Sequence, residues 1–239
     1  MTNYAARQRF YDHLQNTRKS KVICFVTGDR QGMETRIAAD TINIFVDHLD
    51  KMWPCNKITL VLHTDGGDTA AAWQIVNLLR TFSDELEVLI PFKALSSGTL
   101  ISLGANRIVM TKQASIGPID PSLNSPLGPQ IPNKGSATLP VSVEAVQGYI
   151  DVVTDQLKVT DPVALASIWN SLADKIHPLV LGQIFRTRSQ IRNLAKKLLS
   201  NQEIEEEKVN EIIAFLCSDS GSHDHTINRR EAKDMGLNI

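Results

Sequence analysis

The strongest constraint on the fold is a regular alternation of two sequence patterns. Short runs of β-branched and apolar residues, typical of buried strands, occur at residues 21–27, 58–63, 86–92 and 107–111. Between them lie segments with helical spacing, at residues 34–52, 69–82 and 97–105. Strands that alternate with helices form βαβ units, whose strands run parallel. The sequence therefore predicts an α/β fold built on a largely parallel sheet.

The rest of the chain has a different character. Residues 4–18 have the spacing of an amphipathic helix, whose apolar stripe should pack against another element. Residues 117–140 are rich in proline and glycine and predict an extended loop. Residues 141–217 are helical in pattern almost throughout, with a long helix at 178–200 and another at 203–216. We expect one domain over residues 1–239, with 141–217 as its mainly helical layer.

Composition excludes several classes of protein. With 239 residues, 42% of them hydrophobic and 21% charged, the chain has the balance of a soluble globular domain. A net charge of −1 leaves no basic surplus for a nucleic-acid backbone. The three cysteines are widely spaced, which indicates a reducing cytoplasm rather than a disulfide framework. We expect no signal peptide, no membrane span, no metal site and no cofactor.

A first candidate site follows the strand at 58–63. The turn His63-Thr64-Asp65-Gly66-Gly67-Asp68 stands where open α/β sheets bind their ligands, at the carboxyl ends of the strands. Paired glycines allow main-chain N–H groups to face a common oxyanion, as acyl transfer requires. The structural alternative is a tight turn in which Asp68 caps the next helix.

A second candidate site follows the strand at 86–92. Here Ser96, Ser97 and Gly98 lead into a short helix of small and apolar residues. A serine hydroxyl at such a turn lies near the first free amides of the helix, which stabilise negative charge on a neighbouring oxygen. That arrangement suits a nucleophile, whereas the structural alternative is that both serines cap the helix.

Together these turns resemble those of a known family. The stretches LVLHTDGGDTAAAWQI, FKALSSGTLISLGANRIVMTKQASIGPIDPSL and HDHTINRREAKDMGL are similar to the Clp protease proteolytic subunit and signal peptide peptidase A group of serine peptidases. Within that group, the chain is most similar to the serine dehydrogenase proteinase family. The resemblance implies the spiral of ββα units shared with the crotonases, here with an added C-terminal helical layer.

The resemblance also implies roles for particular residues. The nucleophile of the family, in the pattern serine, any residue, glycine, falls on Ser96, with Ser97 as the fallback. The main-chain amides of Ser97 and of the pair Gly66 and Gly67 would form the oxyanion hole. Relatives usually carry proline before the glycine pair, where this chain has Asp65. A carboxylate there would oppose the developing negative charge unless it points away.

The general base is left open between two regions. The position of the Clp histidine falls on Pro118, so that triad is incomplete. In signal peptide peptidase A the base is a lysine some tens of residues downstream, and Lys134 fits that placement if burial lowers its pKa. Lys93 and Lys112 are minor candidates.

The C-terminal segment offers a different base. Asp224 has the spacing of the Clp triad aspartate, and His223 and His225 flank it. A histidine and aspartate supplied by this tail could replace the missing Clp histidine. The structural alternative is a turn leading into a terminal helix.

The leading hypothesis is a cytoplasmic serine endopeptidase that cleaves peptides or unfolded proteins. Two alternatives use the same fold: a crotonase-like acyl-CoA enzyme, or a catalytically lapsed assembly subunit. Family resemblance further implies a homo-oligomer, with an unfoldase or regulatory protein as a further partner.

Overall fold

The computed structural model describes residues 3–52, 55–119, 122–123, 125–131, 137–219 and 225–239. It divides into two compact units: Met1–Ile119 with Leu194–Ile239, and Asp120–Asn193. The first unit contains the sheet and both glycine-containing turns, and the second is mainly helical.

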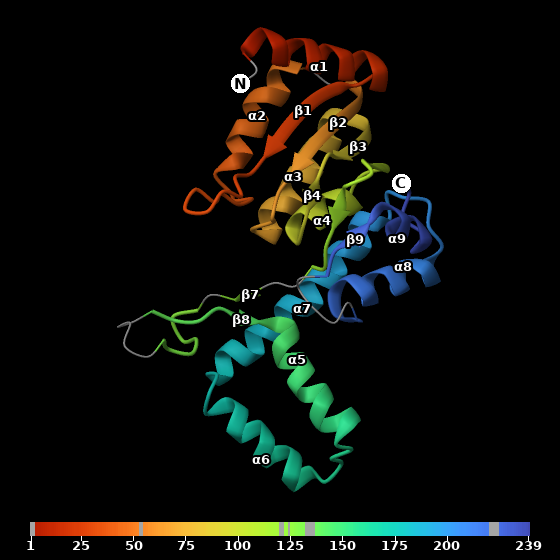
Figure 1. The fold of residues 1–239 in the computed structure, drawn as a ribbon. Coiled ribbons are helices and arrows are strands. Elements are labelled where there is room, and N and C mark those ends of the chain that lie inside the picture. Colours follow the sequence, from red (N-terminus) through yellow and green to blue (C-terminus); the bar gives the residue numbers. More distant parts are fainter. Residues whose placement is uncertain (1–2, 53–54, 120–121, 124, 132–136, 220–224) are drawn as a thin grey trace. The chain divides into compact units, whose positions relative to one another are not determined.

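The first unit is built on a parallel sheet (Figure 1). Its strands lie in the order β1-β2-β3-β5, and all three pairings are parallel. The strands are β1 (Lys21–Val26), β2 (Cys55–His63), β3 (Ser83–Ile90) and β5 (Arg107–Met110). The prediction of a parallel α/β sheet is confirmed. Because all four strands point the same way, the turns that follow β2 and β3 emerge at the same edge of the sheet.

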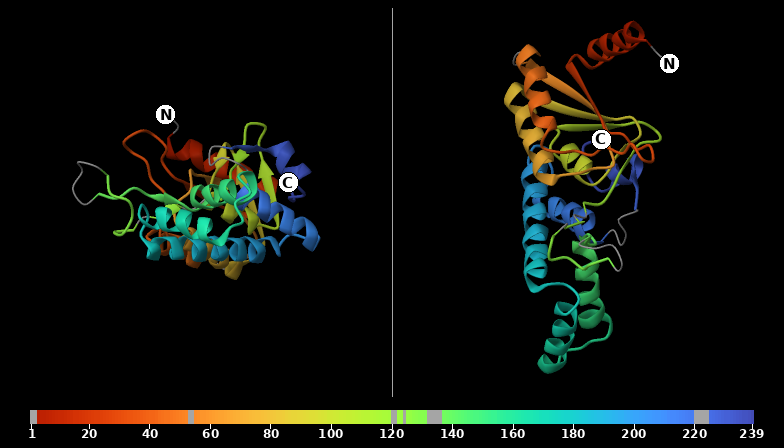
Figure 2. Two further views of the ribbon diagram at one scale, coloured as in Figure 1. Left: turned by 90° about the horizontal axis from the view of Figure 1, so that it is seen from below. Right: turned by 90° about the vertical axis from the view of Figure 1, so that its left-hand side faces the viewer.

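Helices connect these strands as the periodicity predicted. They are α2 (Thr41–Met52), α3 (Thr69–Phe82) and α4 (Ser97–Leu103), and Figure 2 shows α2 and α3 on one face of the sheet. The Asp68 carboxylate accepts hydrogen bonds from the N–H groups of Ala70 and Ala71, so Asp68 does cap α3. This role is compatible with a functional role for the two glycines before it.

The prediction of a helix over residues 34–52 is wrong at its beginning. The helix begins at Thr41, and the segment before it is extended because Ile37 forms a parallel bridge with Gly67. The Ile37 N–H donates to the Gly66 carbonyl at 2.9 Å, and its carbonyl accepts from the Asp68 N–H at 2.8 Å. The glycine turn is therefore paired with a segment from earlier in the chain.

Helix α1 (Tyr4–Arg18) has the predicted bounds but buries none of its residues. Tyr4 is 74% exposed and Phe10 is 62% exposed, so these two residues of the apolar stripe do not pack against the described part of the chain as expected, whereas Leu14 is partly buried. The C-terminal end of the helix is held by Arg18, whose guanidinium forms an ion pair with the fully buried carboxylate of Glu87 on β3.

A small second sheet joins the C-terminal segment to this unit. It consists of β4 (Lys93–Ala94), β6 (Ser115–Ile116) and β9 (Ile227–Asn228). The pairing of β6 with β9 is antiparallel, with Ile116 opposite Ile227. The last elements of the chain are α8 (Glu206–Ala214), the π-helical segment η2 (Phe215–Asp219) and α9 (Arg229–Asp234).

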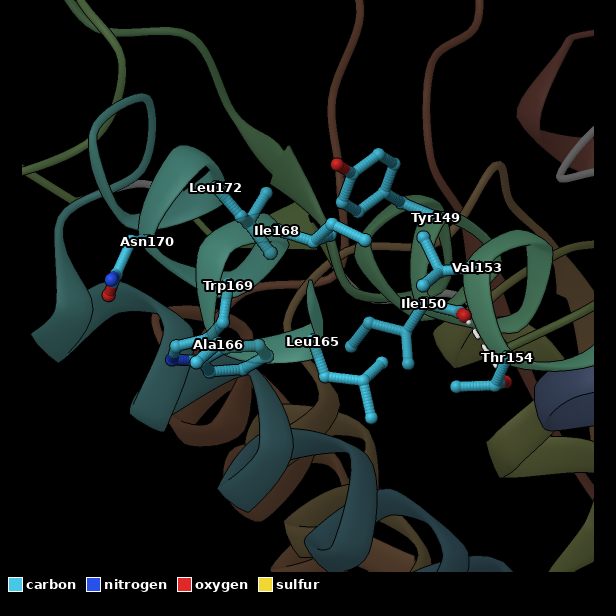
Figure 3. A pocket seen from close by; sticks show the side chains of 10 residues that line it. All are labelled: Tyr149, Ile150, Val153, Thr154, Leu165, Ala166, Ile168, Trp169, Asn170 and Leu172. Carbon is cyan, nitrogen blue, oxygen red and sulfur yellow. Dashed lines mark hydrogen bonds between the residues drawn. The ribbon is translucent and has the colours of Figure 1, made fainter. Parts of the chain in front are cut away.

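The second unit is formed mainly by helices, in agreement with the pattern of residues 141–217. Its elements are β7 (Ser122–Leu123), β8 (Val141–Ser142), α5 (Val143–Asp151), the π-helical segment η1 (Val152–Gln156), α6 (Pro162–Ala173) and the first part of α7 (Pro178–Leu199). Val143, Val146 and Leu181 belong to its buried core. Leu165 and Trp169 of α6 face Tyr149 of α5 across an apolar pocket of about 380 Å³ (Figure 3).

Candidate functional site

The two glycine- and serine-containing turns meet in the first unit. A Cβ atom placed on Gly66 would lie 2.7 Å from Ser96 Cβ and 3.2 Å from Ser96 Oγ. The strands that precede the turns are bridged as well, because the Thr64 N–H donates to the Lys93 carbonyl and the Leu95 N–H donates to the Thr64 carbonyl. The structure thus brings together Gly66, Gly67, Ser96 and Ser97.

Ser96 has an unusual main-chain conformation. Its φ of 52° and ψ of −117° differ from those of the helix that begins at Ser97. A positive φ is costly for a residue with a side chain, by about 1–3 kcal/mol, and such strain gathers at functional sites. A sharp strand-to-helix turn of this kind exposes the side chain at its tip. Ser96 is partly exposed, and its hydroxyl makes no hydrogen bond to any residue that the structure describes.

In the described part of the chain, the adjacent main chain has several N–H groups without acceptors. Within the described part of the chain, neither the Ser97 N–H nor the Gly67 N–H donates to a protein atom. The Gly67 N–H points away from the Ile37 segment, since Ile37 bonds to the flanking residues Gly66 and Asp68. The Gly66 N–H, by contrast, donates to Thr64 Oγ1 at 2.9 Å. Gly67 and Ser97, unlike Gly66, therefore keep N–H groups that have no acceptor among the described residues.

Two buried threonines hold the turns in place. Thr64 Oγ1, which accepts from Gly66, also accepts from Thr27 Oγ1 at 2.8 Å. Thr99 Oγ1 bonds the Ala94 carbonyl and both main-chain groups of Gly117, and thereby joins α4 to the segment after β6. Sequence reasoning did not assign these threonines, although a small polar residue at the end of an apolar strand is a usable signal.

A cluster of charged side chains surrounds Asp65. Lys93 Nζ lies 2.7 Å from Asp65 Oδ1 and 2.9 Å from Asp29 Oδ2. His63 Nε2 lies 3.3 Å from the same Asp29 oxygen. Burial lowers the pKa of Lys93, but its bonds to Asp65 and Asp29 outweigh burial and raise the pKa above its ordinary value. Lys93 is therefore a poor general base, and Asp65 is paired rather than a free anion.

The remaining candidate bases are placed as follows. Lys134, His223 and Asp224 lie outside the described residues. Lys112 is exposed, and Pro118 is buried. His225 Nε2 lies 3.1 Å from Glu231 Oε1, and the His225 ring contacts Phe215 edge to face. In the described part of the chain, no His, Cys, Asp and Glu side chains group together as a metal site would require.

Comparison with known proteins identifies the family. The model for ClpP-like SDH-type serine proteinases matches residues 1–134. Two uncharacterised proteins of Methanocaldococcus jannaschii are related: MJ0137 is 32% identical over 183 residues, 76% of this chain and 53% of the relative. MJ1495 is 27% identical over 182 residues, 76% of this chain and 51% of the relative. The chain thus spans about half the length of these curated relatives.

Solved structures show the same fold. A serine-to-alanine mutant of the 1510-N membrane-bound stomatin-specific protease has a TM-score of 0.51 and 16% identity, covering 90% of this chain and 75% of that chain. A lysine-to-alanine mutant of that protease, in complex with a substrate peptide, has a TM-score of 0.50 and 17% identity, covering 90% and 71%. None of the helices in the described part of this chain has the length and hydrophobicity needed to cross a bilayer. From residue pattern, fold and family match, the chain belongs to the ClpP-like SDH-type serine proteinases.

Proposed function

We propose that this chain is a serine endopeptidase that hydrolyses peptide bonds in peptides or unfolded proteins. The observation that carries the proposal is the contact between Gly66 and Ser96. It gathers the Ser96 hydroxyl and the N–H groups of Gly67 and Ser97, none of which has a partner among the described residues, into neighbouring turns. Family membership and the peptide bound to the 1510-N protease support a peptide substrate.

In the proposed reaction Ser96 Oγ attacks the carbonyl carbon of the peptide bond and loses its proton to a general base. The N–H groups of Ser97 and of the Gly66–Gly67 turn, with Gly67 as the free donor, stabilise the oxyanion of the tetrahedral intermediate. Protonation of the leaving nitrogen breaks the C–N bond and leaves an ester on Ser96. Water then hydrolyses this ester, and the serine regains its proton.

The base is proposed to come from Lys134 or from the tail residues His223 and Asp224. The pairing of β9 with β6 supports the tail, because it runs the C-terminal segment alongside Gly117, whose carbonyl accepts from Thr99. The His225 carbonyl is 3.6 Å from a Cβ placed on Gly117. Lys134 is retained from the family resemblance alone. The pH profile of the reaction rate separates these alternatives in three single variants, Lys134→Met, His223→Gln and His225→Gln. A lysine base gives the profile an alkaline limb, which Lys134→Met should lose. A histidine base gives it a neutral limb, which His223→Gln or His225→Gln should lose.

Labelling with a fluorophosphonate probe tests the nucleophile. The wild-type chain should be labelled, and Ser96→Ala should not be. Ser97→Ala removes a buried hydroxyl but keeps the main-chain amide, so labelling should persist. Label that remains on Ser96→Ala but disappears from Ser97→Ala would move the nucleophile to Ser97. Saturable acyl-CoA binding without labelling would favour the crotonase-like reaction, and no reaction at all would favour an assembly subunit.

Family resemblance supports two further features of the proposal: self-association into a homo-oligomer, and an unfoldase or regulatory protein as a further partner. A cytoplasmic location is proposed from the three widely spaced cysteines. Sedimentation of the purified chain tests the first, because a monomer at all concentrations would contradict it.

A further inference from the structure

Lys93 links the two turns of the candidate site. Its main chain belongs to β4, three residues before Ser96, and its carbonyl accepts from the Thr64 N–H. Its ammonium group reaches the other turn, where it pairs with Asp65, the residue directly before Gly66. The side chain of Lys93 is only 18% exposed, whereas that of Asp65 is 41% exposed. Lys93 thus precedes the serine turn in the chain and forms an ion pair with the glycine turn.

The pairing has an electrostatic consequence for acyl transfer. Asp65 places a carboxylate next to the main chain that is proposed to hold the oxyanion. Two negative charges close together in a partly desolvated site repel each other strongly. The ammonium of Lys93, 2.7 Å from Asp65 Oδ1, offsets the charge of this carboxylate. A second carboxylate, that of Asp29, also pairs with the ammonium, at 2.9 Å.

We infer that Lys93 is a positioning residue of this site: its ammonium offsets the charge of Asp65 and fixes the Gly66–Gly67 turn against β4, the strand that leads to Ser96. This inference rests on the proposed peptidase function. It assigns to Lys93 a role other than that of a general base. The raised pKa of Lys93 agrees with an ammonium that stays protonated throughout the working pH range.

A double-mutant cycle tests the electrostatic part. The readout is the rate of labelling of Ser96 by the fluorophosphonate, separated into kinact and KI, because the oxygen of the probe occupies the oxyanion position. Lys93→Met should lower kinact about tenfold to a hundredfold with KI changed by less than about threefold. The pair Lys93→Met with Asp65→Asn should recover most of that loss, since neither charge remains. Lys93→Arg keeps the positive charge and should therefore retain part of the wild-type kinact.

Several outcomes would overturn the inference. Wild-type kinact in Lys93→Met would show that the ammonium has no role. A double variant as slow as Lys93→Met would show that Asp65 is not what Lys93 neutralises. Loss of one limb of the pH profile in Lys93→Met, with no rescue by Asp65→Asn, would identify Lys93 as the base instead.

Controls keep the two proposals separate. Lys51→Met removes an exposed lysine in the last turn of α2 and should leave labelling at the wild-type rate. Thermal unfolding of every variant establishes that it is folded. If Ser96→Ala and Ser97→Ala are both labelled as fast as wild type, the proposed function fails. If Ser96→Ala is unlabelled and Lys93→Met reacts normally, only the inference about Lys93 fails.

Discussion

Gly66 and Ser96 are so close that no side chain fits between them: a methyl group on Gly66 would stand 2.7 Å from Ser96 Cβ and 2.9 Å from the Leu95 carbonyl oxygen. The φ of Gly66, +106°, is also one that residues with side chains rarely adopt. Both restrictions act on the turn proposed to hold the oxyanion.

Gly66→Ala should therefore slow the labelling of Ser96 strongly while the chain still folds. We expect kinact to fall by about tenfold or more, since small displacements in an active site have large effects on rate. The positive φ should cost roughly 1–2 kcal/mol of stability. The matched control is Gly148→Ala in α5, where a Cβ meets nothing within 4 Å. That variant should be more stable by about 0.5–1 kcal/mol. Labelling of Gly66→Ala at the wild-type rate would contradict the proposal that the Gly66–Gly67 turn holds the oxyanion.

The hydroxyl of Thr64 leads to a second prediction. It accepts hydrogen bonds from both the Gly66 N–H and Thr27 Oγ1. Thr64→Val removes the acceptor and leaves two buried donors unpaired, which should cost about 1–3 kcal/mol and lower kinact. Thr64→Ser keeps the hydroxyl and should retain most of the rate. Equal rates for the serine and valine variants would show that this hydrogen bond does not position the turn.

The buried charge on β3 predicts a dependence of stability on pH. Burial raises the pKa of Glu87, but hydrogen bonds from Arg18, Lys57 and Thr59 outweigh it and leave the pKa below its ordinary value. A carboxyl whose pKa is lowered by folding contributes stability above its unfolded pKa of about 4.3, and loses it as pH falls through the folded value. Urea unfolding of wild type and Glu87→Gln should show a stability difference at pH 7 that shrinks below about pH 4.

Removing the partner of Glu87 tests the same ion pair from the other side. Arg18→Met leaves the carboxylate with Lys57 and Thr59 only, and should destabilise the fold by about 3 kcal/mol at neutral pH. Arg9→Met, in the exposed part of the same helix, should change stability by less than about 0.5 kcal/mol. Equal stability of the two variants would mean that Arg18 does not hold α1 to the sheet.

The sequence predicted the elements whose pattern is local. The β-branched runs and helical spacing predicted α3 at residues 69–82 and a parallel sheet, because burial imposes one periodicity on each element. The same reasoning failed before Thr41. There the bridge from Ile37 to Gly67 keeps the chain extended, and no local propensity reveals a partner thirty residues away.

The candidate site divides in the same way. Ser96 and the glycine pair could be proposed from the sequence because the two motifs, in this order, recur in a family, and the structure places them together. The salt bridge between Asp65 and Lys93 was not, since it depends on the register that sets Thr64 beside Ala94. The ion pair of Glu87 could not be predicted either, because nothing in an apolar strand that contains one glutamate indicates that its partner is an arginine sixty-nine residues earlier.

The bridge at Ile37 limits which amino acids position 67 can accept. A Cβ on Gly67 would stand 2.2 Å from the carbonyl oxygen of Ile37 and 2.5 Å from its nitrogen. Main-chain atoms, unlike a flexible side chain, cannot rotate out of the way. In a saturation library selected for folded protein, codon 67 should return glycine alone.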